Sequence, residues 1–421
     1  MTGTSRATAG VPRAAETPAA LRGAPPVLVV HNHYQRPGGE DQVFAAEAEL
    51  LQDHGHRVIR FVVHNDRIRE ASKLRVAVGT IWSAATYRQL RALIRAERPA
   101  VAHFHNTFPL LSPSVYYAAR AEGVAVVQTL HNFRLLCPNA LFFRDGHTCE
   151  DCLGRAVPWP AVVHACYRGS RAGSAVVAAM LSVHRALRTW SRAVDAYIAL
   201  SEFSRAMLVY GGIPAEKVWV KPNFVRRDPG VGNHRGGFAL FVGRLSSEKG
   251  VETLLAAWER LNSPIPLVIA GDGPLASAVA RATHRSESSV TWVGHRSSED
   301  VVQLMKDARV LLVPSVVYEN FPLVIVEAFS TGLPVIVSDT GSLASIVADR
   351  VTGLHFRRGD PADLAAKVEW AWSRPETLAE MGRRARAAYE ENFTAEANYR
   401  MLMEIYAYAA VRARPRARTR T

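Results

Sequence analysis

The sequence lacks any apolar run near the roughly 18 to 20 residues that a membrane-spanning helix needs. Its first 25 residues are rich in Ala, Thr, Pro, Gly and Arg and lack the continuous apolar core of a signal peptide. We therefore expect residues 1–25 to form a disordered leader of a cytoplasmic protein. With 421 residues, 48% apolar and 21% charged, the chain has the composition of a soluble globular protein and the length of two domains.

Acidic residues are outnumbered: 38 Asp and Glu face 51 Lys and Arg, which gives a net charge of +13. Part of the excess lies in residues 412–420, where arginines alternate without an apolar face. We interpret this basic tail as a solvated, disordered end, and attraction to an anionic membrane or to nucleic acid is the alternative. No aromatic residues interleave with its arginines, so no nucleic-acid partner is expected.

Cysteine is scarce, since only four occur and all lie between positions 137 and 166. Cys149 and Cys152 form a Cys-x2-Cys knuckle, which Cys137 and Cys166 could complete as a tetrahedral thiolate site. Structural disulfides are rare in the cytoplasm, which favours a metal or free thiols. A structural zinc ion is our hypothesis, and reduced buried cysteines or an iron–sulfur cluster are the alternatives.

Short apolar runs alternate with helical segments along the chain. The first set of predicted strands lies at 27–30, 58–63, 101–105, 124–130 and 196–200. The pattern restarts after Lys221-Pro222-Asn223, with predicted strands at 238–243, 267–270, 310–314 and 335–337. This alternation predicts an α/β fold of two doubly wound, Rossmann-like domains, with a cleft beyond the carboxyl ends of the strands. A final helical stretch, 378–406, is expected to cross back to the first domain.

Residues 319–327, Glu-Asn-Phe-Pro-Leu-Val-Ile-Val-Glu, place two carboxylates eight positions apart. Pro322 suits the first position of a helix, because its missing N–H would have no intrahelical partner there. The free N–H groups that follow it, with the positive end of the helix dipole, suit a phosphate. Glu319 in the preceding loop and Glu327 in the helix would then suit the hydroxyls of a sugar and of a ribose.

Two basic residues occupy another predicted strand–loop–helix, residues 242–250. Arg244 offers a planar fork of donors, and Lys249 offers a point charge. Both could contact one diphosphate and stabilise the negative charge left when a sugar departs.

The first strand–helix loop contains Gly38 and Gly39, which permit close approach of the backbone to a phosphate or sugar. They do not form the Gly-x-Gly-x-x-Gly fingerprint of dinucleotide-binding proteins. His131 ends the predicted strand 124–130 and could hydrogen-bond a transferred sugar, although a polar cap is the alternative. We interpret His103 and His105 as structural.

Together with Gly271-Asp272-Gly273-Pro274, these motifs resemble the retaining glycosyltransferases of the GT-B fold, family four. The similarity covers residues 26–395, and the combination of motifs is specific. Residues 201–204 and 212–217 also resemble stretches near that family's interdomain hinge. The chain has Asn223-Phe224-Val225 where the family often has Asn-Gly-Val-Asp, which affects the hinge rather than the donor site.

The resemblance implies that Arg244 and Lys249 hold the donor diphosphate, Glu327 the ribose and Glu319 the donor sugar, with His131 facing that sugar. It implies retention by same-face attack, with the leaving phosphate assisting as base. It also implies catalysis without a metal, which agrees with the absence of an Asp-x-Asp pair. The expected catalytic residues are Glu319, His131, Arg244 and Lys249. The expected donor-binding residues are Gly38, Gly39, Arg244, Lys249, Gly271, Asp272, Asn320, Phe321, Leu323, Val324 and Glu327.

We therefore expect a hexosyltransferase-type enzyme of polysaccharide biosynthesis that uses a nucleoside diphosphate sugar and a hydroxyl acceptor: a polysaccharide, a glycolipid or a small molecule. Residues 26–215 would be the acceptor-side domain with a Cys-rich insertion at 137–166. Residues 216–395 would bind the nucleotide sugar, and residues 396–421 would be a helix end and the basic tail.

Peripheral contact with the inner face of a membrane and a lipid-linked acceptor remain open. The stretch 174–190 is interpreted as a helix that packs on its own domain, with a lipid contact as its alternative. The alternative functions are a sugar-nucleotide epimerase of the same architecture and a non-catalytic basic scaffold that binds membrane or nucleic acid.

Overall fold

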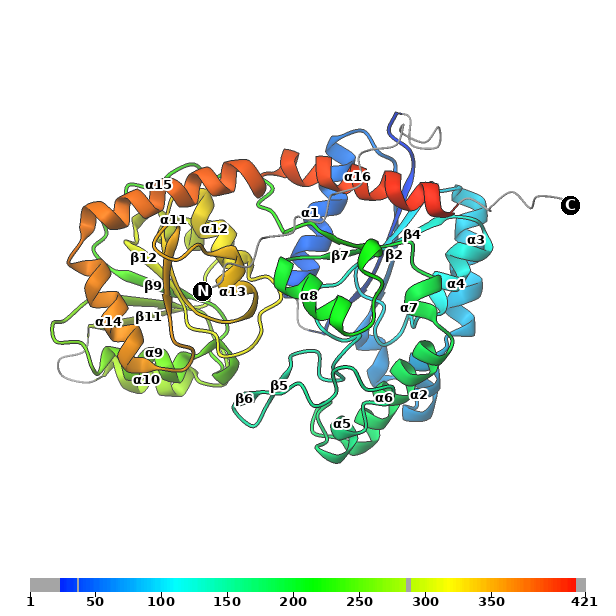
Figure 1. Cartoon of the computed structure of the whole chain (residues 1–421), viewed down its shortest axis with the longest axis horizontal. Coiled ribbons are helices and arrows are strands. Elements are labelled where there is room, and N and C mark those ends of the chain that lie inside the picture. Colours follow the sequence, from blue (N-terminus) through cyan, green and yellow to red (C-terminus); the bar gives the residue numbers. More distant parts are fainter. Residues whose placement is uncertain (1–22, 36–37, 285–288, 414–421) are drawn as a thin grey trace, which may run out of the picture.

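The computed structural model describes residues 23–35, 38–284 and 289–413 (Figure 1). Residues 1–22 of the leader expected at 1–25 and residues 414–420 of the basic tail lie outside these residues. The described chain forms two six-stranded parallel sheets, and alternate residues of the strands face apolar clusters on opposite sides of each sheet. This confirms the predicted pair of doubly wound α/β domains.

The first sheet has the strand order β2-β1-β3-β4-β7-β8. Its strands are β1 (Val27–His33), β2 (Val58–His64), β3 (Val101–Phe104), β4 (Ala125–Thr129), β7 (Ala196–Ala199) and β8 (Val218–Val220). The helices of this domain are α1 (Gly39–Asp53), α2 (Lys73–Ile81), α3 (Ala84–Glu97), α4 (Ser114–Ala121), α5 (Pro160–Val163), α6 (Arg171–Ala186), α7 (Thr189–Arg192) and α8 (Glu202–Tyr210). A small antiparallel hairpin, β5 (Phe143–Arg144) with β6 (His147–Thr148), precedes α5.

The second sheet has the order β11-β10-β9-β12-β13-β14. Its strands are β9 (Ala239–Val242), β10 (Leu267–Ala270), β11 (Val290–Gly294), β12 (Val310–Val313), β13 (Val335–Ser338) and β14 (Gly353–Phe356). Its helices are α9 (Val251–Trp258), α10 (Ala276–Thr283), α11 (Ser298–Asp307), α12 (Leu323–Thr331), α13 (Gly341–Ile346), α14 (Pro361–Trp372) and α15 (Pro375–Asn392).

Each sheet reverses its winding direction at one pair of strands: β1 and β3 in the first, β9 and β12 in the second. Loops that leave the carboxyl ends of two such strands diverge, and the crevice between them is the usual ligand site of an open α/β sheet. The Gly38-Gly39 loop follows β1, the Arg244 loop follows β9 and the Glu319 loop follows β12. The topology therefore places three predicted motifs at these two crevices.

The hairpin strands β5 and β6 were not predicted, and neither were three strands of the two large sheets, β8, β11 and β14, each of which lies at the edge of its sheet. Edge strands are partly solvated, so their apolar runs are short or interrupted, as in Val-Thr-Trp-Val-Gly of β11. Because β8 pairs with β7, residues 218–220 belong to the first sheet, and the predicted domain boundary at residue 215 lies too early. The change of sheet follows Val220, at the Lys221-Pro222-Asn223 segment.

The C-terminal segment consists of two helices rather than the single stretch predicted at 378–406. α15 ends at Asn392, and α16 (Ala395–Ala413) crosses to the first domain, as Figure 1 shows in red. Leu402, Ile405 and Tyr406 of α16 join the apolar cluster that covers one face of the first sheet. The chain therefore passes between the domains twice, and Val225 N–H donates to the Phe393 carbonyl where the two passages meet, at 3.2 Å.

The helix expected at 174–190 corresponds to α6 and the short α7. Val177, Leu181 and His184 of α6 are buried against the first domain, which confirms that this face packs internally. Within the described residues, no helix combines the length and the apolar character that crossing a bilayer requires.

Candidate functional site

The loops that follow β9 and β12 are joined to each other. The 3-10 turn Ser247–Lys249 lies beside the Pro314–Glu319 loop, and Val316 N–H donates to the Glu248 carbonyl at 3.0 Å. Gly250 has φ +71°, and a Cβ there would lie 1.9 Å from the carbonyl oxygen of Pro314. Only glycine fits at this close backbone contact. The contact holds the turn that contains Lys249 against the loop that contains Glu319.

Lys249 and Glu319 form a direct ion pair, with Nζ 2.6 Å from Oε1. The Ser315 hydroxyl donates to the same oxygen at 2.7 Å. The Glu319 side chain is only 12% exposed, against 32% for Lys249. The structure thus brings together two predicted catalytic residues, and the second carboxylate oxygen and the remaining ammonium protons are left for a ligand.

Arg244 is exposed, and no ion pair or hydrogen bond engages its guanidinium within the described part of the chain. Its loop is held by the Gly271-Asp272-Gly273 turn, because Leu245 N–H donates to the Asp272 carbonyl at 2.9 Å. Gly271 has φ +145°, and a Cβ there would lie 1.9 Å from the Gly243 carbonyl oxygen. Gly271 and Asp272, which we predicted as donor-binding, therefore support the loop that presents Arg244.

Pro322 precedes α12 as its N-cap residue, with ψ 113°, and is not the first helical residue as predicted. Leu323 and Val324 form the start of the helix, where backbone N–H groups have no intrahelical acceptor. A Cβ added to Gly39 would lie 3.8 Å from the Leu323 Cδ1. The Gly38-Gly39 loop of the first domain thus faces the start of α12 in the second.

The side chains of two residues between Glu319 and α12, both predicted to bind the donor, make contacts within the protein. Phe321 is buried in the apolar core, and its ring centroid lies 6.2 Å from that of Phe393. Asn320 donates through Nδ2 to the Leu130 carbonyl at 2.6 Å and accepts a hydrogen bond from the Ser204 hydroxyl. Asn320 therefore joins the two domains, next to Glu319 on one side and next to His131 on the other.

Glu327 lies on α12 four residues after Leu323, so the two side chains share a face of the helix. The side chain is partly buried, and burial raises the pKa of its carboxyl group. No side chain of the described residues hydrogen-bonds this carboxyl group, so a ligand hydroxyl would supply a partner that the protein does not.

His131 is one end of a row of buried groups in the first domain. Its Nε2 lies 3.0 Å from Nδ1 of His105, and the two rings stack at 5.2 Å. Burial and the neighbouring His105 hold the pKa of His131 well below its usual value, so the imidazole is neutral. His103 and His105 are buried, in agreement with their structural interpretation.

A buried ion pair lies behind these histidines. Glu47 of α1 and Lys221 of the interdomain segment are 0% and 1% exposed, and Lys221 Nζ lies 2.9 Å from Glu47 Oε2. Burial alone would raise the pKa of Glu47. The Lys221 ammonium and the neighbouring histidines outweigh this effect and hold the pKa of Glu47 well below its usual value. Lys221 also donates to Asn398 of α16 at 3.0 Å, so the pair ties three segments together.

Glu40 is a site residue that the sequence analysis missed. It follows Gly39 in the first turn of α1, accepts a hydrogen bond from the Tyr34 hydroxyl at 2.9 Å and lies 3.4 Å from Asn132 Nδ2. Its Oε1 is buried without a hydrogen bond. Burial raises the pKa of Glu40 to about 8, so the carboxyl group is mostly protonated at pH 7. In the sequence, the position of Glu40 directly after Gly38-Gly39 was the one signal that could have identified it.

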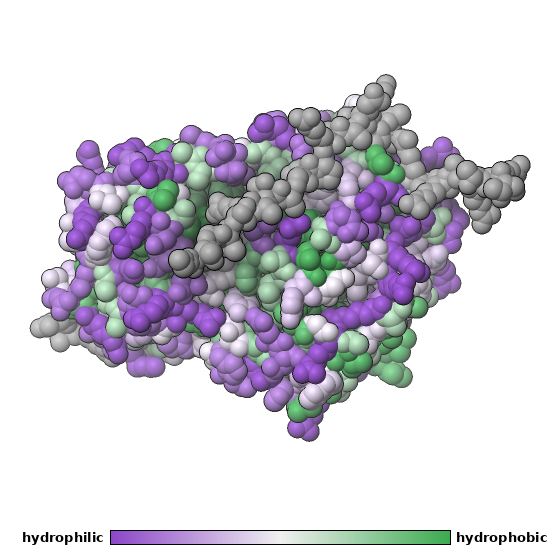
Figure 2. Space-filling model, in the orientation of Figure 1, coloured by the Kyte–Doolittle hydropathy of each residue, from purple (hydrophilic) through white to green (hydrophobic). Residues whose placement is uncertain are grey.

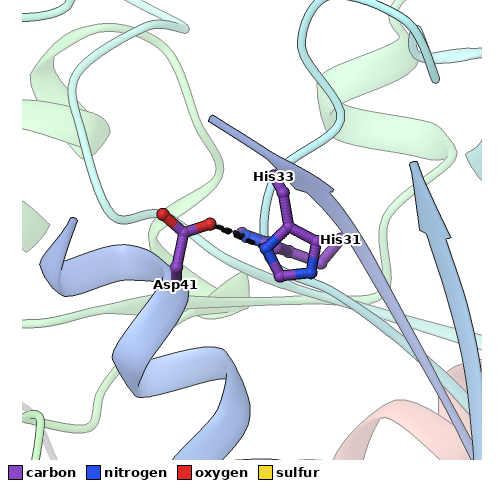
Figure 3. A group of neighbouring side chains, drawn as sticks. All are labelled: His31, His33 and Asp41. Atoms are coloured by element: carbon purple, nitrogen blue, oxygen red, sulfur yellow. Dashed lines mark hydrogen bonds and ion pairs between the residues drawn. The ribbon is translucent and has the colours of Figure 1, made fainter. Parts of the chain in front are cut away.

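Asp41 explains how the glycine loop keeps its shape. One oxygen of Asp41 accepts from the Gly38 N–H at 2.9 Å, and the other lies 2.8 Å from His31 Nε2 and 3.0 Å from His33 Nδ1 (Figure 3). The two histidines end β1, and the carboxylate belongs to the first turn of α1. Both carboxylate oxygens of Asp41 thus have hydrogen-bond partners that do not require a metal. We therefore assign Asp41 the role of positioning the Gly38-Gly39 turn.

A pocket in the first domain opens beside His131. Polar and aromatic side chains line it, among them those of Asn106, Thr107, Phe108, Asn132 and Arg134. The Arg134 guanidinium lies over the Phe108 ring, 4.4 Å from its centroid. This pocket is a candidate acceptor site, with a mixed apolar and hydrogen-bonding wall.

The raised pKa of Glu40 predicts a pH-dependent stability. The unfolded chain loses this proton near pH 4.3 and the folded protein near pH 8, so the folded state binds the proton more tightly. The contribution of Glu40 is fully present below about pH 4 and is lost as the pH rises to about 8. Glu40→Gln has no proton to lose, so we expect it to exceed the wild type in unfolding free energy by about 4 to 5 kcal/mol at pH 8.

Urea denaturation of both proteins at about pH 5 and pH 8 measures this effect. The difference between the two proteins should be small at the lower pH. A difference that is the same at both pH values would show that Glu40 is ionised in the folded protein.

Two family models match consecutive parts of the chain. Glycosyltransferase Family 4 matches residues 37–228, and Glycosyl transferases group 1 matches residues 227–388. Together they span more than four fifths of the sequence.

Individual relatives match shorter parts. D-rhamnosyltransferase WbpZ of Pseudomonas aeruginosa is 34% identical over 161 residues, which are 38% of this chain and 42% of the relative. Glycogen synthase of Mycobacterium tuberculosis is 32% identical over 251 residues, which are 55% of this chain and 58% of the relative. The chain thus spans about half the length of the curated relatives it matches.

Among solved structures, Anabaena Alr3699/HepE in complex with UDP superposes with a TM-score of 0.65 at 17% identity. The superposition covers 90% of this chain and 98% of the Anabaena chain, so the two share the GT-B fold. The chain is thus similar to Glycosyltransferase Family 4 proteins over its first domain and to group 1 glycosyl transferases over its second, and it has their GT-B fold.

Proposed function

We propose that the protein transfers a sugar from a nucleoside diphosphate sugar to a hydroxyl acceptor, with retention of anomeric configuration. The observation that carries the proposal is the Lys249–Glu319 pair, held where the loops of β9 and β12 diverge and just before the start of α12. A cation, a carboxylate and free backbone N–H groups at one crevice are what a charged leaving group and a polyhydroxylated donor need.

In the proposed donor complex, the diphosphate lies between Arg244, Lys249 and the N–H groups of Leu323 and Val324. These groups stabilise the charge that develops on the phosphate as its bond to the sugar breaks. The acceptor hydroxyl attacks the same face of the donor sugar, and a phosphate oxygen takes its proton.

Because protein cations supply the positive charge, we expect equal initial rates with and without added magnesium.

Glu319 would accept hydrogen bonds from the transferred sugar through its second carboxylate oxygen, and Glu327 would hold the ribose. His131, neutral and backed by His105, offers a hydrogen bond from the other side of the cleft. Glu40 carries a proton at neutral pH and so offers a donor near the acceptor pocket.

Calorimetric titration with UDP, GDP and ADP tests the donor site. We expect one nucleotide to bind tightly and Glu327→Ala to weaken it about tenfold or more, because a hydrogen bond to a charged group contributes about 1.5 to 3 kcal/mol. Glu376→Ala, an exposed acid on α15, is the control and should bind as the wild type does.

Three outcomes separate the candidate functions. Binding of no nucleotide would contradict the proposal and favour the basic scaffold. Binding followed by release of an epimerised donor without acceptor would favour the epimerase. Binding that is equally strong in Glu327→Ala would remove this residue from the donor site.

The acceptor proposal includes a lipid-linked hydroxyl compound at the cytoplasmic face of a membrane. Exposed apolar side chains from α2, α5 and α6 gather at the lower right of Figure 2. The exposed apolar residues of these helices are Leu74, Val78, Val163 and Val183, and the cap residues Trp159 of α5 and Leu187 of α6 are exposed as well. Co-sedimentation with anionic phospholipid vesicles tests the contact, and protein that stays in the supernatant at low salt would contradict it.

A further inference from the structure

The four cysteines converge from three separate parts of the segment between β4 and α6. Cys137 follows the turns after His131, Cys149 and Cys152 follow the β5–β6 hairpin, and Cys166 follows α5. All four line one small pocket, together with Asn139, Phe143, Arg144 and Ala161. No disulfide joins them. Cysteines that come from separate loops and line one cavity are typical of a shared metal ion.

The segment that holds them has little regular structure of its own. Between β4 and α6 it contains two strands of two residues each and one helix of four. Backbone hydrogen bonds form isolated turns, such as the bond from Leu153 N–H to the Glu150 carbonyl at 2.8 Å within the Cys149–Cys152 knuckle. Long loops with so little secondary structure are uncommon in compact domains, and a metal bound by cysteines would hold this one in a single conformation.

We propose that Cys137, Cys149, Cys152 and Cys166 bind one Zn²⁺ as thiolates. Binding forms four Zn–S bonds and releases the four thiol protons to solvent, so the affinity rises with pH. A tetrahedral site with bonds of about 2.3 Å places the sulfur atoms about 3.8 Å apart. No three of the four sulfur atoms lie within 4.8 Å of one another here, so the ion would draw the loops together.

The surroundings suit the charge of such a centre. Four thiolates around one Zn²⁺ leave a net charge of −2, and the largely buried Arg144 lines the same pocket. Arg144 also pairs with Asp151 between the two knuckle cysteines, at 3.1 Å, which fixes its side chain beside them. A cation at this position offsets part of the charge of the centre.

The cysteine segment contacts the donor loop, which gives the zinc a consequence beyond its own fold. The Phe142 ring lies 6.4 Å from the ring of Tyr318, the residue before Glu319. The Tyr318 hydroxyl also interacts with the side chain of Glu150, which lies between Cys149 and Cys152, so the knuckle contacts this tyrosine as well. Figure 1 shows the β5–β6 hairpin at the lower edge between the two domains. The zinc therefore stabilises one wall of the cleft.

Metal analysis of the purified full-length chain tests the proposal. We expect close to one Zn per chain in the wild type, and less than about a tenth of that in Cys149→Ser and Cys152→Ser. Replacement of the metal by Co²⁺ should give the intense thiolate charge-transfer and visible bands of a tetrahedral site. His147→Asn is the matched control, because it removes a histidine of the same hairpin and should leave the metal content unchanged.

Several results would overturn the proposal, and none depends on transferase activity. Wild type that is purified without metal, and whose four thiols still titrate freely after Zn²⁺ is added, would exclude the site. Two disulfides, seen as thiols that appear only after reduction, would replace it, and iron with absorption near 400 nm would assign a cluster. If the serine variants do not fold, removal of zinc from the wild type by a chelator, followed by recovery with Zn²⁺ alone, provides the same test.

Discussion

Lys249→Ala lowers the turnover number about a hundredfold to a thousandfold with little change in the free energy of unfolding. Loss of one group that stabilises developing negative charge in a preorganised site has an effect of this size. Lys249 is 32% exposed and paired with Glu319 at 2.6 Å, so its removal leaves no cavity in the core. Its charge acts mainly when the sugar–phosphate bond breaks, so the turnover number should fall more than KM rises.

Initial-rate kinetics with the purified variants measure this effect. Glu319→Gln keeps the shape of the partner and should also reduce turnover, because a neutral amide holds neither the ammonium nor the sugar hydroxyls as a carboxylate does. Lys367→Ala, on α14, is the control for loss of a lysine elsewhere in the same domain. Near-normal turnover of Lys249→Ala would remove this residue from the mechanism.

Glu47→Gln destabilises the folded protein by about 3 to 5 kcal/mol. Removal of one partner of a buried ion pair leaves the other charge without compensation in a medium of low dielectric constant. Lys221 is 1% exposed, and its remaining partner, Asn398 Oδ1 at 3.0 Å, is neutral. The variant also weakens the junction of α1, the interdomain segment and α16, so the loss should appear in unfolding of both domains.

The double variant Glu47→Gln with Lys221→Met separates the charge effect from packing. Since replacing both members of a buried pair by uncharged groups is often nearly neutral, we expect it to recover much of the loss. Chemical denaturation monitored by tryptophan fluorescence provides the free energies. A loss below about 1 kcal/mol in the single variant would mean that water reaches Lys221 in the folded protein.

The sequence predicted nine of the twelve strands in the two large sheets, and eight of these nine lie in the interior of a sheet, where both faces are buried. The ninth, β2, is an edge strand that was predicted from its run of apolar residues. The strands it missed, β8, β11 and β14, are edges with one partly solvated face, as at Trp219 of β8. The periodicity of residues 378–406 continues through Phe393, where the backbone breaks the helix, so one helix was predicted where two exist.

The candidate site likewise contains residues that the sequence could predict and residues that it could not. Lys249 and Glu319 could be predicted because their residue types and their loops after strands specify the chemistry. The contacts of Phe321 and Asn320 could not be predicted, because they depend on distant parts of the fold, Phe393 and Leu130. Glu40 was missed because its raised pKa follows from burial beside Tyr34 and Asn132, which tertiary structure brings together.

The two passages of the chain between the domains restrict how the cleft can open. A single connector would let the domains swivel and twist about one point, but here the segments near Val225 and Phe393 are bonded side by side. Two adjacent pivots define a line, so torsion across that line is hindered and rotation about it remains the soft motion. Such a joint has one effective degree of freedom, and each opening and closing would return the faces carrying His131 and Glu319 to the same alignment.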